Sequence, residues 1–475
     1  MPKKPTHPCT GSTGFDEMNN STIVSRILSQ PAVNAELSAW LRFVEAHAHD
    51  FTIQYPARRE YFIQNFRRTP APSVRDWLSD APEALLYLHV PFCEAKCFYC
   101  NFAVEVSADE QIHVGYVDAL LSELDNHADW LGRTKIRGID IGGGTPTRLP
   151  AKQLARICQA IAPFAQESGH TFPVSIETTP RIVAQEPEKL AVLSSGGVRR
   201  VSMGVQSFNA ATLALVNRRR QIEQTEQAMS NLRTAGFARL NLDVIFGLPG
   251  QTMQDWEADL DRIIALRPDS ITTYDCLYRG KGRALTKIAP STPSPAVYGT
   301  MYDTGYAKLT AAGWHAPYGS VNFSRRADET GTSACFEGRL LDGLPYLGVG
   351  NYASSLRDNH WSFNAYAVGD YVSRINAGSN PCEYYYELPQ AEAQAKYVLY
   401  SLNYGLIDEA RFARRFGISF NEAYPRELDF AVSSGLLNRI DNRWQLPPGQ
   451  FDRMHVLRSL FYPDSAKNWL IKLSA

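Results

Sequence analysis

The chain has 475 residues, of which 44% are hydrophobic and 20% are charged, and its formal net charge is −1. This composition is that of an ordinary globular protein, and the near-neutral charge gives no electrostatic case for a nucleic acid or an anionic membrane as partner. Eight cysteines in a chain of this length do not suggest a disulfide framework. Because no apolar run is long enough for a signal peptide or a membrane span, we expect a soluble, cytoplasmic protein.

Residues 1–80 form an extension with a polar start, followed by apolar residues at helical spacing. From residue 84 onward, short apolar runs alternate with helical segments, which indicates βαβ units around a parallel sheet. Six units are too few for the closed eight-stranded barrel, so the sequence predicts an α/β fold with an open, partial (β/α)6 barrel. The predicted strands are residues 85–90, 138–141, 174–177, 201–206, 240–246 and 271–275.

The alternation ends near residue 280, and the turn-rich residues 281–385 predict β-additions that close the open side of the barrel. A helix-rich region follows, in which residues 407–446 predict two helices and a short β-wing. A winged helix can bind DNA, but the arginines here are sparse and interspersed with acids, which favours a structural or substrate-covering role. The predicted domains are therefore 1–80, 81–280, 281–385 and 386–475.

Three cysteines follow the first predicted strand directly. Three residues separate Cys93 from Cys97, and two separate Cys97 from Cys100. A four-iron cluster normally takes four cysteine ligands, so three thiolates leave one iron open to chelate a small molecule, as a catalytic zinc keeps one open position. The alternatives are a zinc knuckle without its fourth ligand and three unrelated thiols, but the spacing differs from the paired arrays of zinc ribbons.

Other polar or flexible residues end the following strands, where barrels of this kind place their active sites. Gly142 to Gly144 allow a backbone to approach a ligand closely, although a plain tight turn is the alternative, and the sequence is not a P-loop. Glu177 and Asp243 suit ribose hydroxyls or an amine, whereas a single acid at a strand end is more often a surface charge. Gln206 ends the fourth strand.

These motifs together resemble the radical S-adenosylmethionine (SAM) superfamily, in its oxygen-independent coproporphyrinogen III oxidase-like branch, over roughly residues 84–460. The resemblance implies a radical SAM barrel, a [4Fe-4S] cluster on the three cysteines, and the binding of two SAM molecules. It implies that Tyr87, Gly143 and Glu177 contact the first SAM. It also implies that the second SAM contacts six further positions: Tyr99, Gly144, Thr145, Gln206, Arg218 and Asp243.

The resemblance implies that one electron, from a donor of the flavodoxin or ferredoxin type, cleaves the first SAM to a 5′-deoxyadenosyl radical. Phe102 stands where the oxidases carry a further cysteine. The leading hypothesis is therefore that the second SAM donates a methyl or methylene group to an sp2 carbon of a metabolite, by C-methylation or cyclopropanation. The alternatives are coproporphyrinogen III oxidation, an anaerobic heme-degrading methylase and, without catalysis, a heme chaperone. The substrate is an unsaturated metabolite or a tetrapyrrole.

Three residues around the end of the sixth predicted strand are candidate proton or hydrogen relays. They are Tyr274, Cys276 and Tyr278, which stand at alternate positions. Ordinary inward-facing packing along a strand would give the same alternation.

Overall fold

The computed structural model describes residues 35–47, 59–165, 174–218, 222–276 and 292–474. An 11-stranded sheet runs through this part of the chain, in the order β11-β10-β9-β8-β1-β2-β3-β4-β5-β6-β7. The six predicted strands are present, and each is parallel to the next. They are β1 (Glu83–Val90), β2 (Lys135–Gly143), β3 (Val174–Thr178), β4 (Arg200–Gln206), β5 (Arg239–Phe246) and β6 (Ser270–Asp275).

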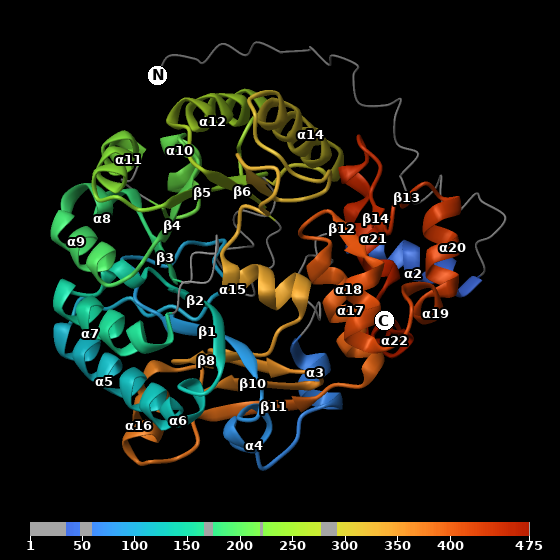
Figure 1. The fold of residues 1–475 in the computed structure, drawn as a ribbon. Coiled ribbons are helices and arrows are strands. Elements are labelled where there is room, and N and C mark those ends of the chain that lie inside the picture. Colours follow the sequence, from blue (N-terminus) through green and yellow to red (C-terminus); the bar gives the residue numbers. More distant parts are fainter. Residues whose placement is uncertain (1–34, 48–58, 166–173, 219–221, 277–291, 475) are drawn as a thin grey trace, which may run out of the picture.

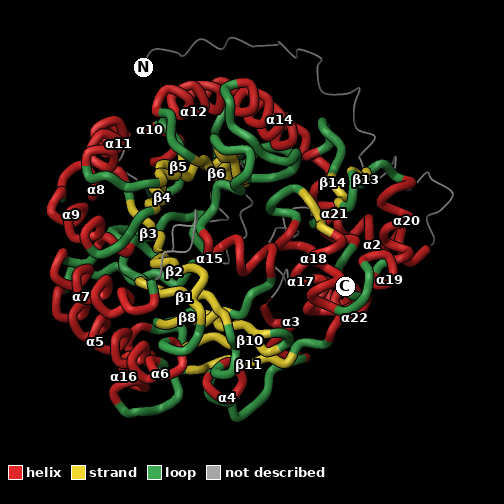
Figure 2. Tube along the Cα trace, in the orientation of Figure 1, coloured by secondary structure: helices red, strands yellow, loops and turns green. Residues whose placement is uncertain are grey.

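Helices surround the curved sheet on its outer side, as Figure 1 and the coloured tube in Figure 2 show. In α7, the buried residues Leu154, Ile157 and Ile161 recur every three or four positions, which gives the helix one apolar face to set against the sheet. The helices between β1 and β6 are α5 (Glu110–Asn126), α6 (Ala128–Leu131), α7 (Ala151–Ile161), α8 (Pro180–Gln185), α9 (Pro187–Ser195), α10 (Ala210–Leu215), α11 (Thr225–Thr234) and α12 (Met253–Leu266). This alternation confirms the predicted partial (β/α)6 barrel.

The β-additions lengthen the sheet at both edges. After α14 (Pro295–Ala311), β7 (Asn322–Ser324) pairs with β6, while β8 (Tyr346–Val349) lies parallel to β1. Beyond β8 come β9 (Ser354–Arg357), β10 (His360–Asn364) and, after α16 (Val368–Asn376), β11 (Cys382–Glu387). Within the described residues, β7 and β11 are the two ends of the sheet and do not pair with each other. The expected closure of the barrel therefore does not arise from strand pairing there.

Residues 331–342, here called the inner segment, instead lie against the inner face of the barrel. The segment contains α15 (Ala334–Glu337) and the π-helical turn η6 (Gly338–Asp342), and Figure 1 shows α15 crossing the middle of the arc of strands. The Ser333 hydroxyl donates a hydrogen bond to Asp140 Oδ2 at 2.6 Å. A Cβ on Gly138 would lie 2.6 Å from the backbone nitrogen of Cys335, so β2 needs glycine where the segment crosses it.

The C-terminal region has the predicted winged-helix-like arrangement. Its three short strands pair in the order β12-β14-β13, all antiparallel. The elements are α17 (Gln390–Ser401), β12 (Leu406–Asp408), α18 (Glu409–Phe416), α19 (Phe420–Ala423), α20 (Pro425–Ser433), β13 (Asn438–Ile440), β14 (Arg443–Gln445), α21 (Met454–Leu460) and α22 (Asp464–Ser474). Among the described helices, none combines the length and the hydropathy that a membrane span requires.

The N-terminal extension contributes α2 (Ala35–Ala46), α3 (Arg59–Asn65) and α4 (Arg75–Leu78) to the described residues. On α2, the Trp40 indole donates a hydrogen bond to the carbonyl oxygen of Ser459 at 3.2 Å. On α3, the ring of Phe62 packs edge-on against Trp361 of β10, with ring centroids 5.6 Å apart. The extension thus packs on the C-terminal helices and on the added strands.

A buried carboxyl group joins α5 to the added strands. Glu123 accepts hydrogen bonds from the Tyr371 hydroxyl at 2.6 Å, from the Gly350 backbone at 2.8 Å and from the Asn364 amide at 2.8 Å. The side chain is 3% exposed, and burial raises the pKa of Glu123 to about 7 despite these three donors. The proton of Glu123 is therefore held in the folded chain at a pH where the unfolded chain has lost it.

We expect Glu123→Gln to flatten the pH dependence of stability. Because the folded pKa lies above the unfolded value of 4.5, the free energy of unfolding falls as pH rises between these two values. From about pH 5 to about pH 7.5 this fall amounts to about 2 kcal/mol, and the Glu123→Gln variant should lack it. Chemical denaturation at both pH values measures the difference. Asp125→Asn, on an exposed position of the same helix, should keep the wild-type pH dependence, and an equal fall in the Glu123→Gln variant would contradict the assignment.

Candidate active site

The predicted site residues come from five neighbouring strands and the loops that follow them. Tyr87 lies on β1 and the three cysteines follow it, while the glycine run ends β2. Glu177, Gln206 and Asp243 lie on β3, β4 and β5, respectively. Since these strands are parallel and adjacent, their carboxyl ends meet at one rim of the barrel. The predicted residues of the first five strands therefore lie at the same rim of the barrel.

The cysteine loop is held by backbone hydrogen bonds to two other segments. The Cys93 amide donates to the Glu105 carbonyl oxygen at 3.0 Å, and the Phe98 amide donates to that of Val216 at 3.0 Å. All three thiols are free and partly exposed. Among the described residues, no three His, Cys, Asp or Glu side chains converge closely enough to hold a single metal ion.

The loop after β2 fits closely against the cysteine loop. The Gly144 amide donates to the Val90 carbonyl oxygen at 2.8 Å, and a Cβ on Gly144 would lie 2.5 Å from the backbone oxygen of Pro91. Gly143 has a φ of +114°, which only glycine adopts readily, and a Cβ there would meet the ring of His89 at 2.5 Å. The glycine run is therefore required by the contact between two backbones as well as by the turn.

Thr145 and Arg218 contact two of the three thiols. The Thr145 hydroxyl lies 3.7 Å from Cys93 Sγ, and Arg218 Nη1 lies 3.8 Å from Cys97 Sγ. The same nitrogen donates to the Tyr99 hydroxyl at 2.9 Å, while Nη2 donates to the Gly204 carbonyl oxygen. Burial raises the pKa of Cys93, and the nearby charge of Arg218 opposes part of that rise.

Glu177 lies under the glycine run. Its carboxylate accepts a hydrogen bond from the Gly143 amide at 3.1 Å, and a Cβ on Gly142 would lie 2.9 Å from the carboxylate. The side chain is accessible to solvent, yet the surrounding barrel encloses it. This enclosure, with the nearby charge of Asp243, raises the pKa of Glu177 to about 8. A cationic or hydrogen-bond-donating ligand would restore the ionised form.

Asp243 is oriented by neighbouring side chains on the inner face of the sheet. It accepts hydrogen bonds from the Ser202 hydroxyl and from the Asn241 amide, both at 2.8 Å. Burial raises the pKa of Asp243, while the hydrogen bond from Ser202 and the charge of Arg200 oppose the rise. The carboxylate is thus held in one orientation before any ligand arrives.

Two buried polar atoms at this rim have no hydrogen-bond partner among the described residues. They are Oε1 of Gln206 and Nε of Arg218. Gln206 also has a φ of +73°, so its backbone adopts a conformation that non-glycine residues seldom take. Unpaired buried polar groups and local backbone strain both favour a site that a ligand completes.

Tyr87 is connected to the cysteine loop through a histidine. His89 Nε2 lies 2.9 Å from the Ala103 carbonyl oxygen, so this nitrogen must carry the proton and donate it. His89 Nδ1 then accepts from the Tyr87 hydroxyl at 3.1 Å. Burial lowers the pKa of His89 to about 4, which keeps the ring neutral and this pattern of donors fixed.

The three candidate relay residues do not share one environment. Tyr274 is 38% exposed, and the barrel walls around it raise its pKa by burial, so it faces an enclosed, solvent-accessible interior. Cys276 is 7% exposed and packs with Val216, Ile245 and Leu248. Tyr278 lies outside the described residues. Of the two described candidates, Tyr274 therefore faces the interior at the end of β6, whereas Cys276 packs in an apolar cluster.

The sequence did not identify the polar residues that the inner segment brings into the barrel. The Tyr404 hydroxyl lies 3.1 Å from the Thr332 hydroxyl, and Arg200 Nη2 donates to the Gly331 carbonyl oxygen at 3.2 Å. Burial, and then the charges of Asp243 and Glu177, raise the pKa of Tyr274, while the charge of Arg200 opposes the rise. These residues could be identified only if the packing of residues 331–342 against β2 were already known.

Comparisons with known proteins agree with this architecture. A family model described as the radical SAM superfamily matches residues 87–263. The oxygen-independent coproporphyrinogen III oxidase of Bradyrhizobium diazoefficiens is 30% identical over 318 residues, which cover 63% of this chain and 69% of the oxidase. The heme chaperone HemW of Bacillus subtilis is 26% identical over 360 residues, or 75% of this chain and 93% of the chaperone.

A solved structure extends the similarity to the fold. The coproporphyrinogen III oxidase HemN from Escherichia coli, a radical SAM enzyme, aligns with a TM-score of 0.66 and 24% sequence identity, covering 80% of this chain and 90% of that chain. The matched family segment spans the cysteine loop and the first five strands, and the oxidase similarity extends well beyond it. The chain therefore belongs to the radical SAM superfamily, in the branch that contains the oxygen-independent coproporphyrinogen III oxidases and the HemW heme chaperones.

Proposed function

We propose that this radical SAM enzyme acts on a tetrapyrrole of the coproporphyrinogen class and starts the reaction by abstracting a hydrogen atom from it. The observation that carries the proposal is the set of Tyr87, Glu177, Arg218 and Asp243 around three free thiols at one barrel rim. The similarity to oxidases that are named for coproporphyrinogen III supports the substrate class.

The residues at the rim fit the cofactors of the superfamily, a [4Fe-4S] cluster and SAM. Three free thiols on one loop provide the ligands of such a cluster and leave one position open. When bound, this pair of cofactors supplies a hydrogen-abstracting radical. We assign Tyr87, Gly143 and Glu177 to the SAM at the cluster, because Glu177 and the glycine run provide an acceptor and a close backbone approach.

We extend the assignment to a second SAM beside the first. The unpaired atoms of Gln206 and Arg218 and the fixed carboxylate of Asp243 would contact it, as would Tyr99 on the cysteine loop. Gly144 and Thr145 complete this set on the loop after β2. The chain's own contribution is to orient these groups beforehand and to keep the reaction enclosed within the barrel.

The comparisons favour tetrapyrrole oxidation over C-methylation, the leading hypothesis from the sequence alone. The relatives that align with this chain over most of their own length are named as coproporphyrinogen III oxidases or as heme chaperones. A heme chaperone is the second candidate, because the B. subtilis HemW similarity covers 93% of that protein. The proposed oxidase reaction also requires an electron donor, of the flavodoxin or ferredoxin type.

Mass spectrometry of the tetrapyrrole distinguishes these functions. The cluster-reconstituted protein is incubated anaerobically with a chemical reductant, SAM and coproporphyrinogen III, and heme replaces the substrate in a parallel reaction. We expect substrate-dependent 5′-deoxyadenosine and a loss of carboxyl mass from coproporphyrinogen III. A gain of methyl mass with S-adenosylhomocysteine would support methylation instead. Stoichiometric heme binding with no tetrapyrrole product and no stimulated SAM cleavage would support the chaperone and contradict the proposal.

A further inference from the structure

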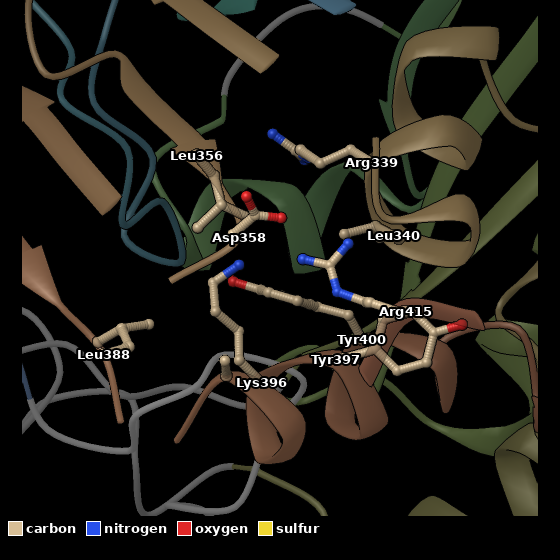
Figure 3. A pocket seen from close by; sticks show the side chains of 10 residues that line it. Arg339, Leu340, Leu356, Asp358, Leu388, Lys396, Tyr397, Tyr400 and Arg415 are labelled. Atoms are coloured by element: carbon tan, nitrogen blue, oxygen red, sulfur yellow. The ribbon is translucent and has the colours of Figure 1, made fainter. Parts of the chain in front are cut away.

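A small pocket lies between the C-terminal helices, the inner segment and the added strands, on residues to which the proposed reaction assigns no role. Lys396 and Tyr400 line it from α17, Arg339 from η6, Arg415 from α18 and Asp358 from the turn after β9. Figure 3 shows the charged ends of Lys396 and Arg415 directed to the space beside Asp358. Three basic side chains and one acidic side chain therefore line the same pocket.

The basic side chains lack acidic partners. Within the described residues, neither Lys396 nor Arg339 has a carboxylate oxygen within 4.0 Å, and Nε of Arg339 is buried without a hydrogen-bond partner. Arg415 donates a hydrogen bond to the Gly343 carbonyl oxygen. The Asp358 side chain is 81% exposed and lies 3.7 Å from the guanidinium of Arg357. Asp358 is thus a weak counter-charge for three cations.

Lys396 is the most deeply buried of the three. It is 7% exposed, and the described residues offer its ammonium two aromatic faces and no hydrogen-bond acceptor. Its Nζ lies 4.4 Å from the ring centroid of Tyr400 and 4.8 Å from that of Trp361. Burial, and then the charges of Arg339 and Arg415, lowers the pKa of Lys396 well below its usual value. Aromatic faces attract an ammonium, but they do not replace the acceptors that it loses on leaving water.

The arrangement is that of a site prepared for an anion. The guanidinium of Arg415 is fixed by the backbone of Gly343, which has a φ of +66° and no room for a Cβ beside the arginine. The free volume of the pocket is about 10 Å³, which holds one water molecule or one end of a small polar group. A carboxylate presents two oxygens at one end and pairs through them with a guanidinium, so this end of the group matches the charges that line the pocket.

We propose that Lys396, Arg415 and Arg339 form a binding site for one carboxylate group. The carboxylate belongs either to a free small acid or to an acidic side chain of a larger ligand that reaches the pocket past η6. Arg339 lies on η6 of the inner segment, and the same segment reaches the inner face of the barrel through the hydrogen bond from Ser333 to Asp140. A bound carboxylate would supply the counter-charge that this pocket lacks and would hold α17 and α18 against the inner segment.

The site is tested by ligand-dependent stability of the cluster-loaded full chain, without turnover. Sodium formate, the smallest carboxylate, is compared with sodium chloride at equal ionic strength by thermal unfolding. We expect formate to raise the unfolding temperature of the wild-type chain more than chloride does, because only the folded chain has the site. Lys396→Met, which keeps the apolar stem and removes the charge, should lose the difference between the two salts. Lys396→Arg should retain part of it.

Lys152→Met, at an exposed position of α7, is the matched control and should respond as the wild-type chain does. Equal effects of formate and chloride on the wild-type chain would overturn the proposal, whether or not the Lys396→Met variant folds. A formate-specific rise that persists in Lys396→Met would also overturn it. This readout is independent of the proposed function, which can fail in the mass-spectrometric assay while the anion site remains.

Titration with coproporphyrin III, which carries four carboxylates, identifies the source of the group. If a tetrapyrrole side chain enters the pocket, formate should compete with coproporphyrin III. The Lys396→Met substitution should then weaken the binding of coproporphyrin III about tenfold, as expected for the loss of one charge-assisted hydrogen bond. If a free acid occupies the pocket, coproporphyrin III should bind both chains equally while the formate response is kept. Both results support the carboxylate site and separate its two possible ligands.

Discussion

Replacing Cys97 by alanine should abolish cluster binding and SAM cleavage. Two thiolates would remain for a cluster that already has one position without a cysteine ligand. The substitution also removes the sulfur that lies 3.8 Å from Arg218, so the guanidinium loses a partner at the same rim. We expect the purified variant to contain less than about a tenth of the wild-type iron, and SAM cleavage to fall below detection. Iron analysis and chromatography of 5′-deoxyadenosine measure the two effects.

Cys158→Ala is the control for this experiment. Cys158 is buried on α7, where its side chain packs against Gly196, away from the cysteine loop. This variant loses one buried sulfur but should keep its iron content and its SAM cleavage. Wild-type iron content in the Cys97→Ala variant would show that the cluster does not depend on the three-cysteine loop.

Replacing Glu177 by glutamine should weaken SAM binding about ten- to a hundredfold. A hydrogen bond to a charged group contributes about 1.5–3 kcal/mol, and each 1.4 kcal/mol is about a factor of ten in affinity. Glutamine keeps the shape of the side chain and an acceptor for the Gly143 amide, so the loss reports the negative charge. Equilibrium dialysis of labelled SAM against the anaerobic, cluster-loaded variant measures the dissociation constant.

Glu188→Gln tests whether any loss of a carboxylate has this effect. Glu188 lies on α9 at an exposed position, outside the barrel. Its variant should bind SAM with wild-type affinity. If Glu177→Gln also bound SAM as the wild-type chain does, with normal iron content, Glu177 would have a structural role only and the assignment to the cofactor would be wrong.

The sequence was sufficient for the barrel because local patterns decide it. The apolar run that forms β1 and the alternation of short strands with helical segments are both short-range signals. The location of the site at one rim of the barrel could be predicted from these signals, because parallel strands place their carboxyl ends together. The predicted residues Glu177 and Asp243 therefore meet through topology, which their spacing in the sequence does not show.

Long-range contacts were beyond the sequence. Nothing near Gly138 indicates that Cys335 will lie against it, and nothing near Lys396 indicates that Arg339 will line the same pocket. The surroundings of Cys276, a candidate relay residue, could not be predicted either. The expected alternation assumes a continuing strand, but β6 ends at Asp275 and Cys276 turns into a hydrophobic cluster.

The position of β1 in the sheet has a consequence for how the protein is made. β1 lies between β2 and β8, and Leu85 pairs with Tyr346, so one edge of the cysteine-bearing strand stays unpaired until most of the chain has been synthesised. Such an edge is prone to pair with other chains, and contacts between distant residues form slowly. A nascent chain that stops before β8 would thus expose both an open strand and three free thiols. Completion of β8 therefore sets the earliest moment at which β1 can be paired along both of its edges.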